Sequence, residues 1–268
     1  NPGFPIYESM IKFSGAVPVP LQLQEETGYH PDLDLLPSLI TSNTRLIILN
    51  SPENPCGSNL SHAELEKIAN IVRQHQNLYI MSDEIYKDIL YTDSHNSIAA
   101  MQGMSEKTII LDGLSKSYAM TGWRLGYGIM PSELVPHITR LAVNSVSCAA
   151  SFSQIAALAA LDGPQDDVET MVTEFAIRRT LISEGLRSIP NINCPEPEAA
   201  FYALPSIKNL GLSSSEFEDR SLREAGVALL AGNAFGEFGE GYVRLSYANS
   251  QDNIQRAIER LDKFVRSL

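Results

Sequence analysis

Cysteine is scarce in this chain, and its scarcity argues against two kinds of protein. Among the 268 residues there are three cysteines, Cys56, Cys148 and Cys194. The number is odd and no two of them have the close spacing of a metal site, so neither a disulfide framework nor a metal centre is indicated. We expect reduced thiols in a cytoplasmic protein, with Cys148 and Cys194 acting as packing residues.

Basic side chains and long apolar runs are also in short supply. The chain has 20 Lys and Arg against 32 Asp and Glu, a net charge of −12, which argues against a nucleic-acid partner because such proteins have a basic stripe. No apolar run approaches the roughly 18 residues needed to cross a bilayer, so we expect no membrane partner. No signal peptide is visible.

The composition that remains is that of an ordinary globular protein. Hydrophobic residues make up 44% and charged residues 19% of the chain. A chain of this length can bury a sizeable core, arranged as one large domain or as two modest ones.

Short apolar runs alternate with helical patterns in the first part of the chain. The runs at 45–50, 78–82, 108–111 and 125–129 are typical of buried strands. Residues 61–75 have the pattern of a helix, which a capping box of Ser61 and Glu64 would begin. Continuous apolar strands separated by helices indicate an α/β fold with a mostly parallel sheet covered on both faces.

The second part of the chain has a different pattern. Residues 131–189 are almost wholly helical in pattern, and they are followed by predicted strands at 201–204 and 242–245 and predicted helices near 214–225 and 250–266. These elements indicate a compact α+β unit. We therefore predict two domains, 1–170 and 171–268.

Polar residues follow the predicted strands, where ligands bind in open α/β sheets. Asn54 follows the first strand, Asp83 and Tyr86 follow the second, Lys116 follows the third, and Arg124 precedes the fourth. Each has a simpler explanation when taken alone, such as a helix cap for the aspartate, a solvated loop residue for the lysine or a turn for Asn-Pro. Their order and spacing carry the argument for a site.

Four segments resemble the class I and II aminotransferases, which are pyridoxal 5′-phosphate (PLP) enzymes of fold type I. They are Asn54-Pro55-Cys56-Gly57, Ser82-Asp83-Glu84-Ile85-Tyr86, the block from Ser115 to Tyr127, and Val243-Arg244-Leu245-Ser246-Tyr247. The likeness is greatest to the aspartate and aromatic aminotransferase branch and extends over essentially the whole chain. It implies that 1–170 is the C-terminal part of the PLP-binding large domain and that 171–268 is the small α+β domain.

The resemblance assigns five residues to the cofactor ring. Lys116 would hold PLP as a Schiff base and carry the proton during catalysis, since a neutral lysine amine is both nucleophilic and basic. Asp83 would pair with the pyridine nitrogen, Tyr86 and Asn54 would hydrogen-bond the ring oxygen O3′, and Phe4 would stack on the ring.

The resemblance assigns further residues to the two anionic groups of the site. Arg124 would bind the cofactor phosphate with its guanidinium fork, and Ser115 would add a hydroxyl to that phosphate. Arg244 would bind the substrate α-carboxylate, helped by Asn54. The implied reaction moves an amino group from an L-amino acid to a 2-oxo acid, and the implied assembly of the intact protein is a homodimer.

Alternatives stay open at this point. A PLP-dependent carbon–sulfur lyase or synthase would have the same cofactor residues, and so would an aminotransferase-like sensor domain. The chain also begins abruptly at Asn1, without the roughly one hundred residues that precede this segment in relatives. We therefore expect a fragment that is inactive or binds PLP weakly by itself.

Three positions depart from the family pattern. Gly113 stands where many relatives have a phosphate-binding serine, Cys56 replaces the threonine of the Asn-Pro-Thr-Gly turn, and Ala199 replaces a glycine. These departures put single contacts in doubt rather than the assignment.

Overall fold

Two compact units make up the computed structural model, which describes residues 1–92 and 94–268. Unit 1 consists of Asn1–Leu39, Glu53–Asn59 and Thr173–Leu268, and unit 2 consists of Ile40–Pro52 and Leu60–Val172. The N-terminal residues therefore belong to the same unit as the C-terminal part of the chain. The two domains expected from the sequence, 1–170 and 171–268, were each continuous in the chain, and that division stays a prediction.

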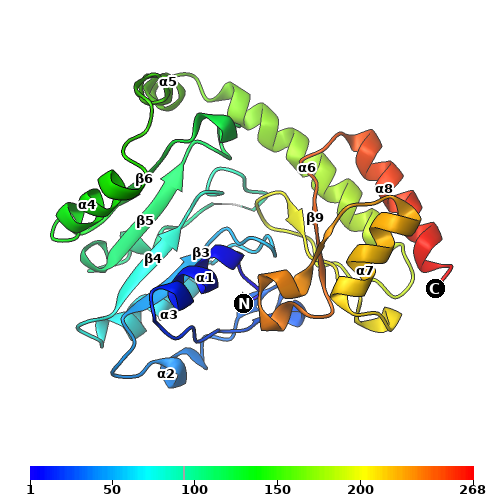
Figure 1. Cartoon of the computed structure of the whole chain (residues 1–268), viewed down its shortest axis with the longest axis horizontal. Coiled ribbons are helices and arrows are strands. Elements are labelled where there is room, and N and C mark those ends of the chain that lie inside the picture. Colours follow the sequence, from blue (N-terminus) through cyan, green and yellow to red (C-terminus); the bar gives the residue numbers. More distant parts are fainter. Residues whose placement is uncertain (93) are drawn as a thin grey trace. The chain divides into compact units, whose positions relative to one another are not determined.

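A four-stranded sheet forms the centre of unit 2 (Figure 1). Its strands are β3 (Leu46–Asn50), β4 (Tyr79–Asp83), β5 (Thr108–Gly113) and β6 (Gly126–Ile129), in that spatial order. The first three are parallel, and β6 runs antiparallel to β5 at one edge. The mostly parallel sheet and the α/β fold class predicted from the sequence are confirmed.

The register of this sheet brings the polar ends of its strands to one edge. Asn50 at the end of β3 is paired with Asp83 at the end of β4, and Asp83 is paired with Leu111 near the end of β5. The residues that follow these parallel strands therefore start from the same edge, as a site beyond the carboxyl ends requires.

Helix α3 (His62–Arg73) shows how local sequence sets an element of unit 2. The Ser61 hydroxyl accepts a hydrogen bond from the Glu64 amide and the Glu64 carboxylate accepts one from the Ser61 amide, which is the predicted capping box. The apolar face of α3 repeats every three or four residues and is buried: Leu65, Ile68, Ala69 and Val72.

The other helical segments of unit 2 lie between the strands or after the last of them. Short 3₁₀ turns lie at Ile98–Ala100, Ser105–Lys107 and Thr121–Trp123, and helices α4 (Val135–Ser145) and α5 (Ser151–Asp162) come after β6. Helix α6 (Asp166–Arg187) then continues into unit 1. The region 131–189 is therefore helical as predicted, but divided into three helices.

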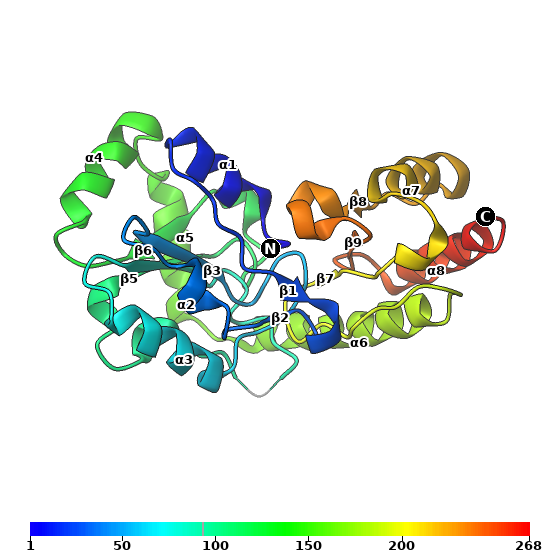
Figure 2. The same cartoon turned by 90° about the horizontal axis from the view of Figure 1, so that it is seen from below.

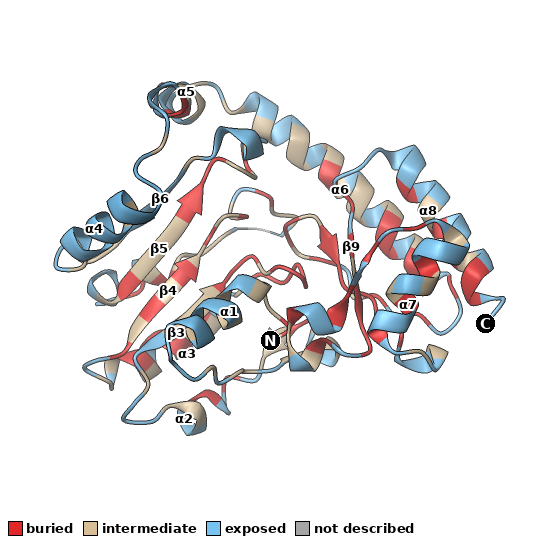
Figure 3. Ribbon diagram, viewed as in Figure 1, coloured by how far each residue is buried: buried red, intermediate tan, exposed pale blue. Residues whose placement is uncertain are grey.

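Unit 1 contains a small antiparallel sheet with strands β7 (Tyr202–Ala203), β8 (Leu230–Ala231) and β9 (Val243–Ser246) in the order β7-β9-β8. Helix α7 (Ser214–Arg220) continues into a π turn at Ser221–Ala225, and helix α8 (Gln251–Val265) closes the chain (Figure 2). Figure 3 shows the buried stripe of α8, which consists of Ile254, Ile258, Leu261, Phe264 and Val265.

The N-terminal elements of unit 1 are short. They are α1 (Pro5–Phe13), the two-stranded ladder of β1 (Leu23–Gln24) with β2 (His30–Pro31), and α2 (Leu36–Leu39). Further 3₁₀ turns lie at Glu25–Thr27, Lys208–Leu210, Gly232–Phe235 and Glu237–Gly239.

The cysteines divide by burial. Cys56 and Cys194 are buried, whereas Cys148 is exposed, so the expectation that Cys148 is a packing residue is wrong. Burial raises the pKa of the Cys194 thiol to about 12, which keeps it protonated at neutral pH. Within the described residues, no helix is both long enough and apolar enough to span a membrane.

Candidate active site

Lys116 lies in the loop that leaves β5 at the polar edge of the sheet in unit 2. Its ammonium nitrogen is 5.8 Å from the centroid of the Tyr86 ring, and the side chain is partly buried. The loop is tightly turned, because the Ala119 amide donates to the Lys116 carbonyl at 3.1 Å and Ala119 has a positive φ of 52°. A solvated surface lysine, the simpler interpretation of the sequence, does not describe this position.

Asp83 and Tyr86 belong to one turn after β4. The Asp83 carboxylate accepts a hydrogen bond from the Ile85 amide at 3.2 Å, while the Asp83 carbonyl accepts from the Ser51 amide at 3.1 Å. Tyr86 follows and is only 3% exposed. The structure therefore brings together three of the predicted residues, Asp83, Tyr86 and Lys116, at one sheet edge.

Glu84 fixes this turn through a buried network that the sequence did not reveal. Its carboxylate, in a residue that is 4% exposed, accepts hydrogen bonds from the Ser82 hydroxyl at 2.9 Å and the Ser97 hydroxyl at 2.7 Å. The His95 Nε2 donates to its other oxygen at 3.0 Å. Burial by itself would raise the pKa of Glu84, but these hydrogen bonds outweigh burial and lower it.

A second cluster lies beside the Lys116 loop. Asp112 near the end of β5 accepts a hydrogen bond from the Tyr127 hydroxyl at 2.6 Å and forms an ion pair with Lys87 at 2.6 Å. Burial, together with the hydrogen bond to Asp112, raises the pKa of Tyr127 to about 12. Burial works against the charge of Lys87, but the carboxylates of Asp112 and Asp88 outweigh it and raise the pKa of Lys87. The cluster joins β5 to β6 where the loop begins.

Gly113 is required by the backbone at this place. A Cβ atom added there would lie 2.9 Å from the Gly126 Cα and 3.0 Å from the Leu125 carbonyl oxygen. Because β5 and β6 approach so closely, a side chain at 113 would force the strands apart. This close approach gives a structural reason for a glycine at a position where many relatives have a phosphate-binding serine.

Ser115 and Arg124 flank Lys116 on the same connection. Ser115 is partly buried, and Arg124 is exposed at the start of β6 in the left-handed conformation, with a φ of 54°. The Arg124 guanidinium donates to the Thr121 carbonyl at 2.9 Å, which still leaves other N–H groups of the fork for an anion.

Unit 1 brings together Asn54 and Arg244. The Arg244 Nη1 donates to the Asn54 side-chain oxygen at 2.9 Å, although the two residues are 190 positions apart. The guanidinium carbon lies 4.4 Å from the Tyr202 ring centroid and 4.8 Å from that of Phe235. Neither aromatic residue was predicted from the sequence as part of a site.

The turn that holds Asn54 is tightly packed. Gly57 has a φ of 76°, and a Cβ atom there would lie 2.7 Å from the Pro197 side chain and 3.0 Å from the Ala199 carbonyl oxygen. The amides of Glu198 and Ala199 both donate to the Gly57 carbonyl. Only glycine combines this conformation with this closeness.

Phe4 also belongs to unit 1. It immediately precedes α1, its ring is 41% exposed, and it makes an edge contact with Tyr7 at a centroid distance of 5.8 Å. The neighbouring Gly3 amide donates to the Phe235 carbonyl at 2.8 Å, which anchors the segment.

Comparison with known proteins places the chain in a family. Residues 1–261 match the model of the family described as aminotransferase class I and II. The chain is 39% identical over 269 residues to an aspartate aminotransferase of Pyrococcus abyssi, covering 99% of this chain and 69% of the relative. It is 38% identical to an aromatic-amino-acid aminotransferase of Thermococcus litoralis, with the same coverage of the two chains.

Solved structures agree with the sequence relatives. The chain superimposes on an aromatic aminotransferase from Pyrococcus horikoshii with a TM-score of 0.96 and 38% identity, covering all of this chain and 72% of that one. An alanine aminotransferase from Pyrococcus furiosus gives a TM-score of 0.91 at 32% identity, covering 69% of its length. The chain therefore belongs to the class I and II aminotransferase family, as the four segments indicated, and is a transferase of amino groups.

Proposed function

We propose that this protein is a pyridoxal-phosphate-dependent aminotransferase in which Lys116 carries the cofactor. The observation that supports this most directly is the partly buried Lys116, 5.8 Å from the ring of the buried Tyr86 and on the same sheet edge as Asp83. The substrates of the proposed reaction are an L-amino acid and a 2-oxo acid.

The residues of unit 2 suit the chemistry of this cofactor. Its aldehyde needs an amine, its pyridinium nitrogen needs a carboxylate and its phosphate needs a cation, which Lys116, Asp83 and Arg124 respectively supply. The Ser115 hydroxyl would add a hydrogen bond to the phosphate. When bound, the cofactor supplies an electron sink for the negative charge that develops at the substrate Cα.

The other ring contacts come from the remaining predicted residues. The phenol of Tyr86 and the amide of Asn54 would hydrogen-bond the ring oxygen O3′, and Phe4 would stack on the ring. Asp83 would keep the ring nitrogen protonated, because the carboxylate favours the charged form of a group that it contacts.

Lys116 would also act as the general base. Once neutral, its amine would take the proton from the substrate Cα, a role that suits a basic amine held at the reacting carbon. The ring of Tyr86, whose centroid is 5.8 Å from the amine, would limit the positions that the amine can take.

Arg244 would bind the α-carboxylate that all amino-acid substrates share. Its planar fork suits bidentate binding of a carboxylate, and Asn54 and the two aromatic rings already fix the orientation of the guanidinium. Asn54 would thus assist both the cofactor and the substrate in this proposal.

We further propose that the enzyme works as a homodimer. Helices α4 and α5 each expose four large apolar side chains, which is the kind of surface that a partner subunit covers. They are Val135, Ile138, Leu141, Val143, Phe152, Ile155, Leu158 and Leu161.

The role of Lys116 can be tested in the full-length enzyme by reduction with borohydride in the presence of pyridoxal phosphate, followed by peptide mapping. We expect the cofactor on the peptide that contains Lys116, and its loss in Lys116→Ala together with a roughly 10²–10⁴-fold fall in transamination rate. Lys67→Ala, at an exposed position of α3, serves as the matched control. Cofactor retained on Lys116→Ala would contradict the assignment, and release of ammonia without a 2-oxo acid acceptor would indicate a lyase.

A further inference from the structure

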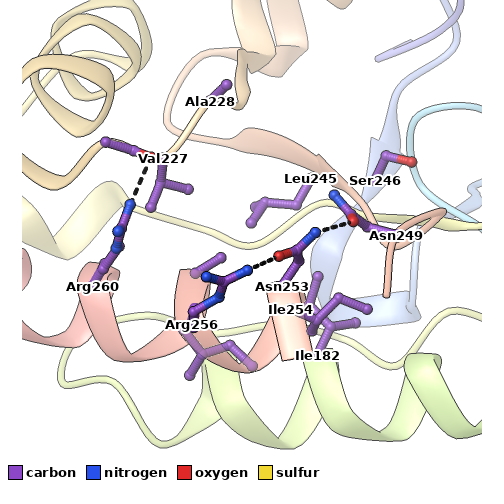
Figure 4. A pocket seen from close by; sticks show the side chains of 13 residues that line it. Ile182, Val227, Ala228, Leu245, Ser246, Asn249, Asn253, Ile254, Arg256 and Arg260 are labelled. Atoms are coloured by element: carbon purple, nitrogen blue, oxygen red, sulfur yellow. Dashed lines mark hydrogen bonds between the residues drawn. The ribbon is translucent and has the colours of Figure 1, made fainter. Parts of the chain in front are cut away.

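A cavity of about 360 Å³ lies within unit 1, apart from every residue assigned above to the cofactor or substrate. Figure 4 shows that α8 forms one side of it, with the end of β9, residues 226–228 and Ile182 of α6 around it. Its volume is at the lower end of the range for small-molecule sites, roughly 300–1,000 Å³.

The floor of this cavity is aliphatic. Ile182, Val227, Leu245, Ile254 and Ile258 line it, and each of them is less than 9% exposed. Such a surface gains free energy by covering the apolar part of a ligand.

The rim of the cavity is polar and cationic. Arg256 and Arg260 are one turn apart on α8, so that they lie on the same side of the helix. Arg256 donates to the side chain of Asn253, and Asn253 donates to Asn249 at 2.7 Å (Figure 4). Among the described residues, Arg260 makes only a long hydrogen bond, of 3.4 Å, to the Gly226 carbonyl.

These two arginines differ from most arginines of unit 1 because those form ion pairs with carboxylates. Six others form ion pairs with carboxylates: Arg178, Arg179, Arg187, Arg220, Arg223 and Arg266. Across residues 1–92 and 94–268, no carboxylate pairs with Arg256 or Arg260, and none of the thirteen residues that line the cavity is acidic. The exposed Arg256 and Arg260 therefore give the cavity lining two positive charges and no negative one, which favours an anionic ligand.

We propose that this cavity binds a small amphipathic organic anion. Its carboxylate or phosphate monoester group is held by Arg256 and Arg260, whose guanidinium forks suit either group. Its apolar body covers the aliphatic floor. The inference does not depend on the proposed aminotransferase chemistry, because no residue is shared between the two sites.

Calorimetric titration of the protein with 3-phenylpropionate and with phenyl phosphate tests the proposal. Binding of at least one probe is expected, and Arg256→Gln and Arg260→Gln should each weaken it about tenfold by removing a charge-assisted contact. Arg266→Gln removes the same charge from the end of α8, outside the cavity, and should leave the affinity unchanged. The probe that binds more tightly identifies the anionic group.

Two further ligands test the chemistry of the bound molecule, and two variants separate this site from the proposed active site. Acetate and 3-phenylpropanol, which lack the apolar body and the charge respectively, should bind at least tenfold more weakly than 3-phenylpropionate. Ala228→Trp, at an exposed lining position, should block binding, whereas Arg244→Gln should preserve it. The proposal is overturned if neither probe binds, if the Arg256→Gln/Arg260→Gln double variant binds as the wild type does, or if Arg244→Gln abolishes binding.

Discussion

Arg244 lies against two aromatic rings, and this arrangement does more than a single positive charge can do. The centroid distances of 4.4 Å to Tyr202 and 4.8 Å to Phe235 leave the planar guanidinium little freedom to rotate. The hydrogen bond to Asn54 fixes it further. A preorganised fork loses less conformational entropy when it binds a carboxylate than a mobile one does.

Replacing either ring by an aliphatic side chain should weaken the binding of the amino-acid substrate. Since a cation–π contact contributes about 0.5–2 kcal/mol, Tyr202→Leu and Phe235→Leu are expected to raise KM by roughly two- to thirtyfold. The effect on kcat should be smaller, because the carboxylate contact is present in the ground state and the transition state alike. Steady-state kinetics measures both quantities.

Tyr202→Phe is the matched control, since it keeps the ring over the guanidinium. Its KM should remain near that of the wild type, and a thermal melt should show that the leucine variants are folded. Equal KM values for Tyr202→Leu, Phe235→Leu and the wild type would contradict a positioning role for the rings.

At the scale of elements, the turn after β4 depends on the residues around Ser97. The Glu84 carboxylate connects the turn that carries Asp83 and Tyr86 to Ser97 and His95, which lie on the following segment. The amide of Glu84 also donates to the Leu111 carbonyl on β5 at 2.9 Å. A buried carboxylate with several donors stabilises such a junction only while it is ionised.

The lowered pKa of Glu84 predicts a loss of stability in acid. The folded pKa lies below the ordinary value of 4.5, so this carboxylate contributes its full stabilisation above pH 4.5 and loses it as the pH falls through the folded value. Glu84→Gln should therefore lower the free energy of unfolding at pH 7 by about 2 kcal/mol, and by less as the pH decreases below 4.5. Urea unfolding at a series of pH values measures this difference.

Glu106→Gln, which removes an exposed carboxylate from the same unit, provides the control and should change stability little at either pH. A difference between the wild type and Glu84→Gln that stays constant between neutral and acidic pH would mean that the network is not coupled to ionisation.

At the scale of the whole molecule, the apolar surface of α4 and α5 bears on assembly. The eight exposed apolar side chains on these helices include Leu141 at 66% and Leu158 at 56% exposure. Surfaces of this kind are covered in most proteins, by further polypeptide or by a second subunit.

Introducing charge on this surface should weaken self-association. Leu141→Glu and Leu158→Glu are expected to shift the weight-average mass towards that of the monomer, because a buried unpaired carboxylate at an interface costs several kcal/mol. Light scattering coupled to size-exclusion chromatography, over a range of concentrations, measures this mass. Leu222→Glu, at an exposed leucine of unit 1, should leave it unchanged, and identical masses for all variants would argue against a dimer through α4 and α5.

The sequence by itself determined the elements whose signals are local. The strands β3, β4 and β5 and the capping box of α3 follow from runs of neighbouring residues, so they could be located within a residue or two. The order and spacing of Asp83, Tyr86, Lys116 and Arg124 likewise indicated the family before any contact was known.

Only the tertiary structure decided the contacts between residues that are distant in the chain. Strand β8 has two residues and exists because β9 pairs with it, the rings beside Arg244 come from separate segments, and Gly113 is needed because β6 folds back on β5. The tertiary structure likewise decided which residues pair with Asp112 and Glu84, and it formed the cavity beside α8. Periodicity and capping depend on residues that are close in the sequence, so a local pattern reveals them. The other features depend on packing and on charges between distant segments, so no local pattern reveals them.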